Sequence, residues 1–77
     1  MEQKLLMALT AHYSAELHKA EADLLIYFKN PIGVGEHGKL TEEMIAIVDR
    51  VSAARGGLEV VKSLAGPEAP QEAPQEN

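Results

Sequence analysis

A chain of 77 residues forms one domain at most, and a chain of this length buries only about 60% of the surface that it exposes when unfolded. It contains no cysteine, so neither disulfides nor cysteine-based zinc sites can supply additional stability. The net charge of −5 comes without a cluster of lysine and arginine, which excludes nucleic acid as an expected partner.

A long helix is predicted over residues 3–29. Its apolar residues recur every three or four positions, which keeps them on one stripe, and neither Gly nor Pro interrupts them. Asn30 and Pro31 end this helix, because proline has no N–H and disfavours the helical conformation of the residue before it. The stripe consists of Leu6, Leu9, Tyr13, Leu17, Ala20, Leu24 and Tyr27, and it is widened by Leu5, Ala8, Ala15, Ile26 and Phe28.

Residues 30–41 are predicted to form the corner of a helical hairpin. Gly33, Gly35 and Gly38 can take positive φ without steric cost, so the connection can reverse tightly. A phosphate-binding turn is disfavoured, because no strand precedes these glycines and Glu36 opposes an anion. The residues expected to shape the loop, with the last two bonding loop amides or capping the next helix, are Asn30, Pro31, Gly33, Gly35, Glu36 and His37.

A second helix is predicted over residues 42–65. Thr41 is a suitable N-cap, and Leu40 and Ile45 have the spacing of a hydrophobic staple. Gly56-Gly57 interrupts the pattern, but the apolar phase is the same on both sides, which favours one continuous helix over a kink. The apolar stripe consists of Met44, Ile47, Val48, Val51, Ala54, Leu58, Val61 and either Leu64 or Ala65.

The hairpin is therefore expected to occupy residues 1–66, and residues 67–77 are expected to be a disordered acidic tail. This tail repeats Ala-Pro-Gln-Glu and has no large apolar residue to bury. The chain has no apolar run of the roughly 20 residues that span a bilayer, and its start lacks the layout of a signal peptide. We therefore expect a protein that is not secreted and has no membrane partner.

No residue set in the sequence forms a catalytic signature, and we predict neither an enzyme nor a cofactor. His12 and Glu16 lie four residues apart on the first helix, a spacing that can place two metal ligands on one face. Such a site would need further ligands from a second chain, with His37 as a candidate. We therefore predict no metal site within one chain and keep a site at an oligomer interface as the weakest alternative.

The loop and its flanks resemble a known family. A tyrosine near a helix end, then Asn-Pro-x-Gly-x-Gly-Glu-His, then Leu-Thr-Glu-Glu, is similar to short helical-hairpin proteins that are common among tailed bacteriophages. The resemblance covers residues 27–43. It implies a two-helix fold and a phage or prophage origin, with a location in the host cytoplasm or the virion, and it carries no established activity.

The sequence thus predicts an all-α protein, a coiled-coil-like antiparallel hairpin of two helices that assembles into a four-helix bundle. The expected function is a structural or protein-interaction module, such as an accessory particle component or an adaptor, working as a homo-oligomer or within a larger assembly. The alternative is a small regulator that binds a host protein through an apolar groove. The predicted interface residues are Leu6, Leu9, Tyr13, Leu17, Leu24, Tyr27, Ile47, Val51, Leu58 and Val61.

Overall fold

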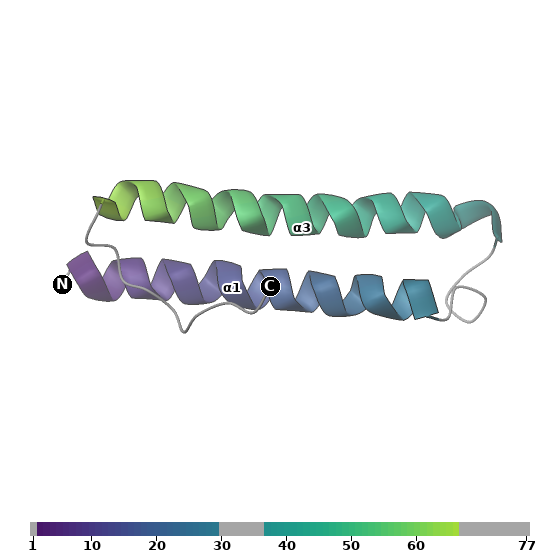
Figure 1. Cartoon of the computed structure of the whole chain (residues 1–77), viewed down its shortest axis with the longest axis horizontal. Coiled ribbons are helices and arrows are strands. Elements are labelled where there is room, and N and C mark those ends of the chain that lie inside the picture. The colour runs from purple at the N-terminus through teal and green to yellow at the C-terminus, as the bar shows by residue number, and fades with distance from the viewer. Residues whose placement is uncertain (1, 30–36, 67–77) are drawn as a thin grey trace.

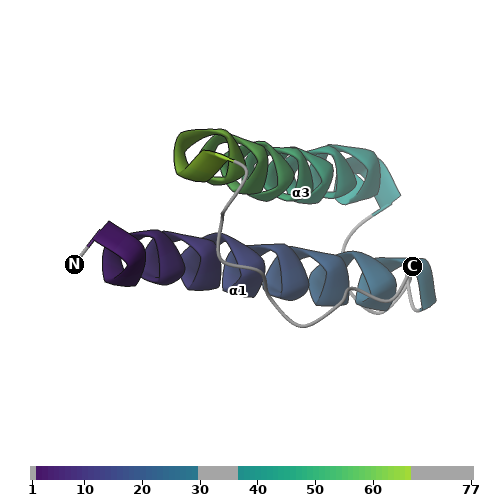
Figure 2. The ribbon, with the colours of Figure 1, turned by 60° about the vertical axis from the view of Figure 1, so that its left-hand side comes forward.

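The computed structural model describes residues 2–29 and 37–66, and these residues form two long helices (Figure 1). Helix α1 spans Glu2–Lys29 and helix α3 spans His37–Ala65. The two helices run antiparallel and lie side by side in both views (Figures 1 and 2). The predicted all-α, antiparallel two-helix hairpin is therefore confirmed, whereas the four-helix bundle stays a prediction.

Helix α1 is continuous because its sequence is built from strong helix formers. Alanine, leucine, glutamate and lysine make up most of its 28 residues, and it contains no glycine or proline. Glu2 in the first turn and Lys29 in the last turn also complement the helix dipole. The observed bounds differ from the expected range of 3–29 by one residue.

Helix α3 runs without a break through Gly56-Gly57. This continuity was predicted because the apolar residues on both sides of the pair keep the same helical phase. It ends at Ala65, and the next residue, Gly66, has a φ of +77°. A glycine in this left-handed conformation commonly follows the last helical residue, because it has no Cβ to clash with the preceding carbonyl. Lys62 in the last turn supports the same helix end electrostatically.

The predicted start of the second helix is wrong. Helix α3 begins at His37, so Thr41 lies inside the helix and is not its N-cap, and Gly38 is helical rather than part of the corner. The staple is wrong too, since Ile45 is 55% exposed. Leu40 is half-buried in the extra helical turn, so tertiary packing outweighs the local capping signal and the cost of a helical glycine, about 1 kcal/mol.

The hydrophobic core is thin. Only four of the described residues are buried, and none of them is a fully buried large side chain. Three of the four belong to α3 and recur every seven residues, as expected for a coiled-coil-like seam. These four residues are Ala20, Ile47, Ala54 and Val61.

The apolar stripes are narrower than the sequence pattern suggested. Val48 and Leu64, which were expected on the second stripe, are 47% and 69% exposed, and Ala65 is the half-buried residue at the end of that stripe. All five residues expected to widen the first stripe are exposed as well. Two helices can cover only one side of each other, so an apolar residue beyond the seam stays on the surface.

Candidate interaction surface

The predicted interface residues lie along the seam between α1 and α3. Ile47 and Val61 are buried, and the other eight are half-buried. They therefore pack largely within the hairpin, and whether they also meet another chain is a prediction. The predicted loop residues from Asn30 to Glu36 lie outside the described residues, and His37 is the first residue of α3.

A different set of apolar side chains is available to a partner. Nine large hydrophobic side chains in the described residues are between 47% and 69% exposed. Periodicity pointed to only some of them, because a sequence stripe does not show where the seam ends and the surface begins. The nine are Leu5, Met7, Leu25, Ile26, Phe28, Ile45, Val48, Val60 and Leu64.

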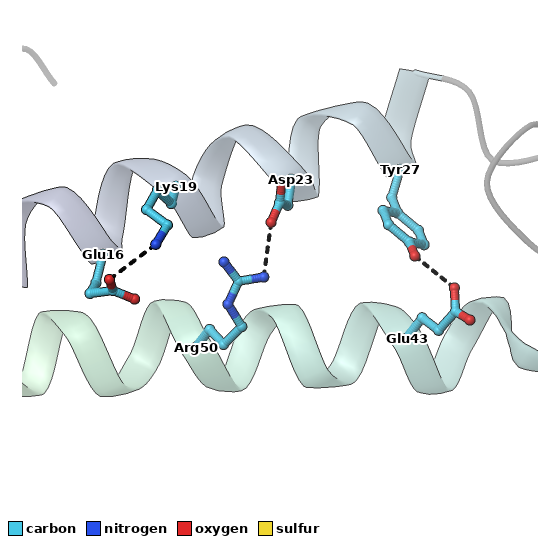
Figure 3. Close-up of polar contacts among 6 residues, drawn as sticks. All are labelled: Glu16, Lys19, Asp23, Tyr27, Glu43 and Arg50. Carbon is cyan, nitrogen blue, oxygen red and sulfur yellow. Dashed lines mark hydrogen bonds and ion pairs between the residues drawn. The ribbon is translucent and has the colours of Figure 1, made fainter.

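Polar contacts cross the seam at one edge of the hairpin, here called the Arg50 edge (Figure 3). The guanidinium of Arg50 donates from Nη1 to Oδ2 of Asp23 at 2.9 Å, and the hydroxyl of Tyr27 donates to Oε1 of Glu43 at 2.6 Å. Both contacts join α1 to α3. The charged pair is solvent-exposed, so it contributes about 0–1 kcal/mol and chiefly orients the helices.

The hydrogen bond to Glu43 raises the pKa of Tyr27 above its usual value of 10.0, with smaller contributions from partial desolvation and from the negative charges of Glu43 and Asp23. The cause is simple, since a neutral hydroxyl can donate to the carboxylate whereas a phenolate would be repelled by it. The contact therefore requires the protonated tyrosine.

The Arg50 edge also carries a shallow groove of about 290 Å³. Its polar wall is formed by the two bonded pairs, and its apolar part by Ile26, Ala46 and Ile47. All four polar side chains of this groove already have a bonding partner within the chain. The groove is therefore shallow, and its polar side chains are already paired within the chain.

The opposite edge, here called the Arg55 edge, is marked by an ion pair between Nη2 of Arg55 and Oε2 of Glu21 at 3.4 Å. Successive residues turn by about 100° around a helix, so Glu21 and Asp23 lie on opposite sides of the buried Ala20. By the same count Arg55 and Arg50 flank the buried Ala54. The two edges are therefore distinct surfaces of one hairpin.

Tyr13 of α1 and Gly57 of α3 make a close contact across the seam. The ring of Tyr13 lies over the backbone of Gly57, where an added Cβ would meet Cδ1 and Cε1 of the ring and would come within 2.8 Å of its Cγ. Nothing lies within 4 Å of the position of a Cβ on Gly56. The His12 ring contacts Tyr13 edge-on, with ring centroids 4.8 Å apart. Only the second glycine of the pair is therefore required by packing.

The predicted metal candidates do not meet within the described part of the chain. No group of three or more possible ligands comes together there. Glu16 accepts from Nζ of Lys19 at 3.3 Å, and His12 packs against Tyr13. A metal site that uses a second chain stays a prediction.

Neither of the described helices has the length and apolarity needed to cross a lipid bilayer. Comparison of the chain with models of protein families, with curated proteins and with solved structures found no match. The surface itself is therefore the basis for a functional interpretation.

Proposed function

We propose that this chain is a non-enzymatic structural or protein-interaction module, and that its exposed apolar side chains bind another protein chain, most simply a second copy. The observation that carries this proposal is the imbalance between surface and core. Nine large hydrophobic side chains are exposed, whereas four residues are buried, two of them alanines. A hairpin of this kind leaves more large apolar side chains exposed than it buries fully, so association that covers them is favourable.

Energetic considerations support the same proposal. A helical chain of this size has a marginal core, and helices gain most of their stability from tertiary packing of an apolar face. Fully burying one Leu, Val or Phe side chain contributes about 1.5–3 kcal/mol. Burying even a few of the exposed residues in a four-helix bundle would therefore match the stability of an ordinary small domain, about 5 kcal/mol or more.

The resemblance of the segment around the loop to hairpin proteins of tailed phages leads us to propose a phage or prophage origin. The module would then act in the host cytoplasm or in the virion, as an accessory particle component or an adaptor. Both roles need a small protein that has a protein-binding surface and requires no catalytic activity.

A second candidate is a small regulator that binds a host protein as a monomer. The groove at the Arg50 edge favours it, because this groove offers Ile26, Ala46 and Ile47 beside two oriented polar pairs. The two candidates differ in the oligomeric state of the isolated chain. It would remain a single hairpin until it meets its partner.

Light scattering of the purified chain separates these candidates. We expect a single closed oligomer whose mass is constant over a wide range of concentrations and does not respond to added divalent metal. A monomer at every concentration would contradict self-association and favour the regulator. A mass or melting temperature that rises with metal would favour the interchain site of His12, Glu16 and His37.

A further inference from the structure

The Arg55 edge is apolar next to its ion pair. Leu25 and Phe28 follow Glu21 at helical intervals of four and seven, so they lie on the same side of α1 as that carboxylate. Val48 precedes Arg55 by seven residues and therefore lies on the same side of α3. These three apolar side chains are 53%, 67% and 47% exposed. They form one apolar strip that runs from the ion pair towards the loop end of the hairpin.

We propose that a second copy of this chain packs on the Arg55 edge, related to the first by a twofold axis parallel to the helices. This inference rests on the proposed self-association and adds the face and the orientation. Rotation about such an axis keeps every residue at its own level along the bundle. It places α1 of one copy beside α3 of the other, so that all neighbouring helices are antiparallel.

Charge complementarity supports this arrangement. The ion pair shows that Glu21 and Arg55 lie at the same level of the hairpin. In the twofold assembly Glu21 of each copy therefore faces Arg55 of the other, and four charges alternate in sign around the axis. A twofold interface must be self-complementary, and this surface is, because each charge meets an opposite charge of the partner and like charges are not brought together.

The apolar strip supports the same axis. With the axis parallel to the helices, Leu25 and Phe28 of one copy meet the level of Val48 of the other, at the shared loop end. If the axis were instead perpendicular to the helices and the two copies overlapped along their whole length, the apolar strip of one copy would face the end of its partner that is far from the loop. Since the chain extends over 48 × 20 × 18 Å, one long face has the size of a standard interface, roughly 800 Å² per partner.

The Arg50 edge is a poorer surface for a second copy. It carries two polar pairs that cross the seam, whereas the Arg55 edge carries one, the ion pair of Arg55 and Glu21 at the longer distance of 3.4 Å. Glu16 and Lys19 add an exposed ion pair at 3.3 Å in the same region (Figure 3). Covering this edge would remove water from six polar side chains, whereas covering the Arg55 edge removes water from the one ion pair described there, and desolvation of polar groups costs free energy.

Two charge-inverted variants test the inference. Glu21→Arg and Arg55→Glu each place like charges at the axis, and we expect each variant alone to dissociate at least tenfold more readily than the wild-type chain in sedimentation equilibrium. Mixed in equal amounts, the two variants should form a mixed dimer, because every contact between the two chains at the axis then joins opposite charges. The pair within each chain remains broken in the mixture, so recovery reports only the contact between chains.

Matched controls come from the Arg50 edge. Asp23→Arg and Arg50→Asp break an equivalent pair within the chain, and we expect both to stay as associated as the wild type, before and after mixing. Circular dichroism of every variant shows whether the helices are retained. If the Glu21 and Arg55 variants fail to recover on mixing while the wild type is an oligomer, the assignment of the face is overturned and the proposed self-association stands. A monomeric wild type overturns both.

The orientation has a separate readout. Because the chain contains no cysteine, Lys39→Cys provides one labelling site near the loop end, on an exposed residue away from the Arg55 edge. With the axis parallel to the helices, spin labels on the two copies should lie well within the 48 Å length of the chain. A separation equal to that length or greater would overturn the parallel axis.

Discussion

Gly56 and Gly57 are neighbours in sequence with opposite surroundings. The space around a Cβ on Gly56 is empty, whereas a Cβ on Gly57 would overlap the ring of Tyr13. The atoms in its way are Cγ, Cδ1 and Cε1, one edge of a rigid ring that can move only as a whole. The same residue type is thus dispensable at one position and required at the next.

We predict that Gly57→Ala lowers the free energy of unfolding by about 1–3 kcal/mol, because the added methyl group overpacks the seam. Gly56→Ala should raise it by about 0.5–1 kcal/mol, the ordinary gain from replacing an exposed helical glycine. Urea unfolding of the two variants measures both values. Equal effects would contradict the packing of Tyr13 on Gly57.

The hydrogen bond from Tyr27 to Glu43 predicts a dependence of stability on pH. The folded chain raises the pKa of Tyr27, so the tyrosine holds its proton in the folded state at a pH where the unfolded chain has lost it. This contribution is fully present below pH 10, and it is lost as the pH rises through the raised pKa.

We therefore expect the free energy of unfolding of the wild type to fall more steeply above pH 10 than that of Tyr27→Phe, which cannot titrate at this position. The difference between the two curves isolates the contribution of Tyr27, because every other residue is common to both proteins. Tyr13→Phe is the matched control, since it removes the hydroxyl of the other tyrosine and leaves the bond from Tyr27 to Glu43 in place. Parallel curves for the wild type and Tyr27→Phe would show that the bond to Glu43 does not form in solution.

At the scale of the helices, the sequence predicted more of the interior than of the ends. Spacings of three and four residues identified both helices and most of their seam-facing residues, because the apolar side chains recur with the period of a helix. The start of α3 was misplaced since Thr41 has the chemistry of a cap. The partial burial of Leu40 in the extra turn is not visible in a local pattern.

Ile45 and Ile47 test the seam of α3 with the same side chain in two environments. Ile47 is 6% exposed and Ile45 is 55% exposed, on the side of the helix away from the seam. We expect Ile47→Ala to lower the free energy of unfolding by about 2–4 kcal/mol and Ile45→Ala to change it by about 0.5 kcal/mol or less. Thermal unfolding followed by circular dichroism distinguishes them, and a larger loss for Ile45→Ala would place the seam on the wrong side of α3.

For the whole molecule, the candidate surface was harder to predict than the fold. Periodicity does not tell that Ala20 and Ala54 lie at the centre of the seam, and their burial is what places Asp23 and Arg50 on one edge and Glu21 and Arg55 on the other. It also does not tell that Leu25 or Val60 escapes burial. Those properties belong to the pair of helices and not to either one.

If the exposed apolar side chains are buried between copies, stability becomes a property of concentration. We expect the melting temperature to rise as the protein concentration is raised, because association stabilises the folded state by mass action. Leu25→Glu should abolish this dependence while leaving the helices formed. An unchanging melting temperature for the wild type would contradict association coupled to folding.

The contact between Tyr13 and Gly57 also determines how α1 and α3 are aligned along their length. Each stripe repeats at nearly equal intervals, so sliding one helix along the other by a turn or two would again place apolar residues opposite each other. Between Lys39 and Ala65 the only positions without a side chain are Gly56 and Gly57, and nothing lies within 4 Å of the position of a Cβ on Gly56. A slipped hairpin would press the Tyr13 ring against Ala53 or Val61 instead of a gap. Gly57 therefore acts as a notch that fixes the alignment of two otherwise repetitive surfaces.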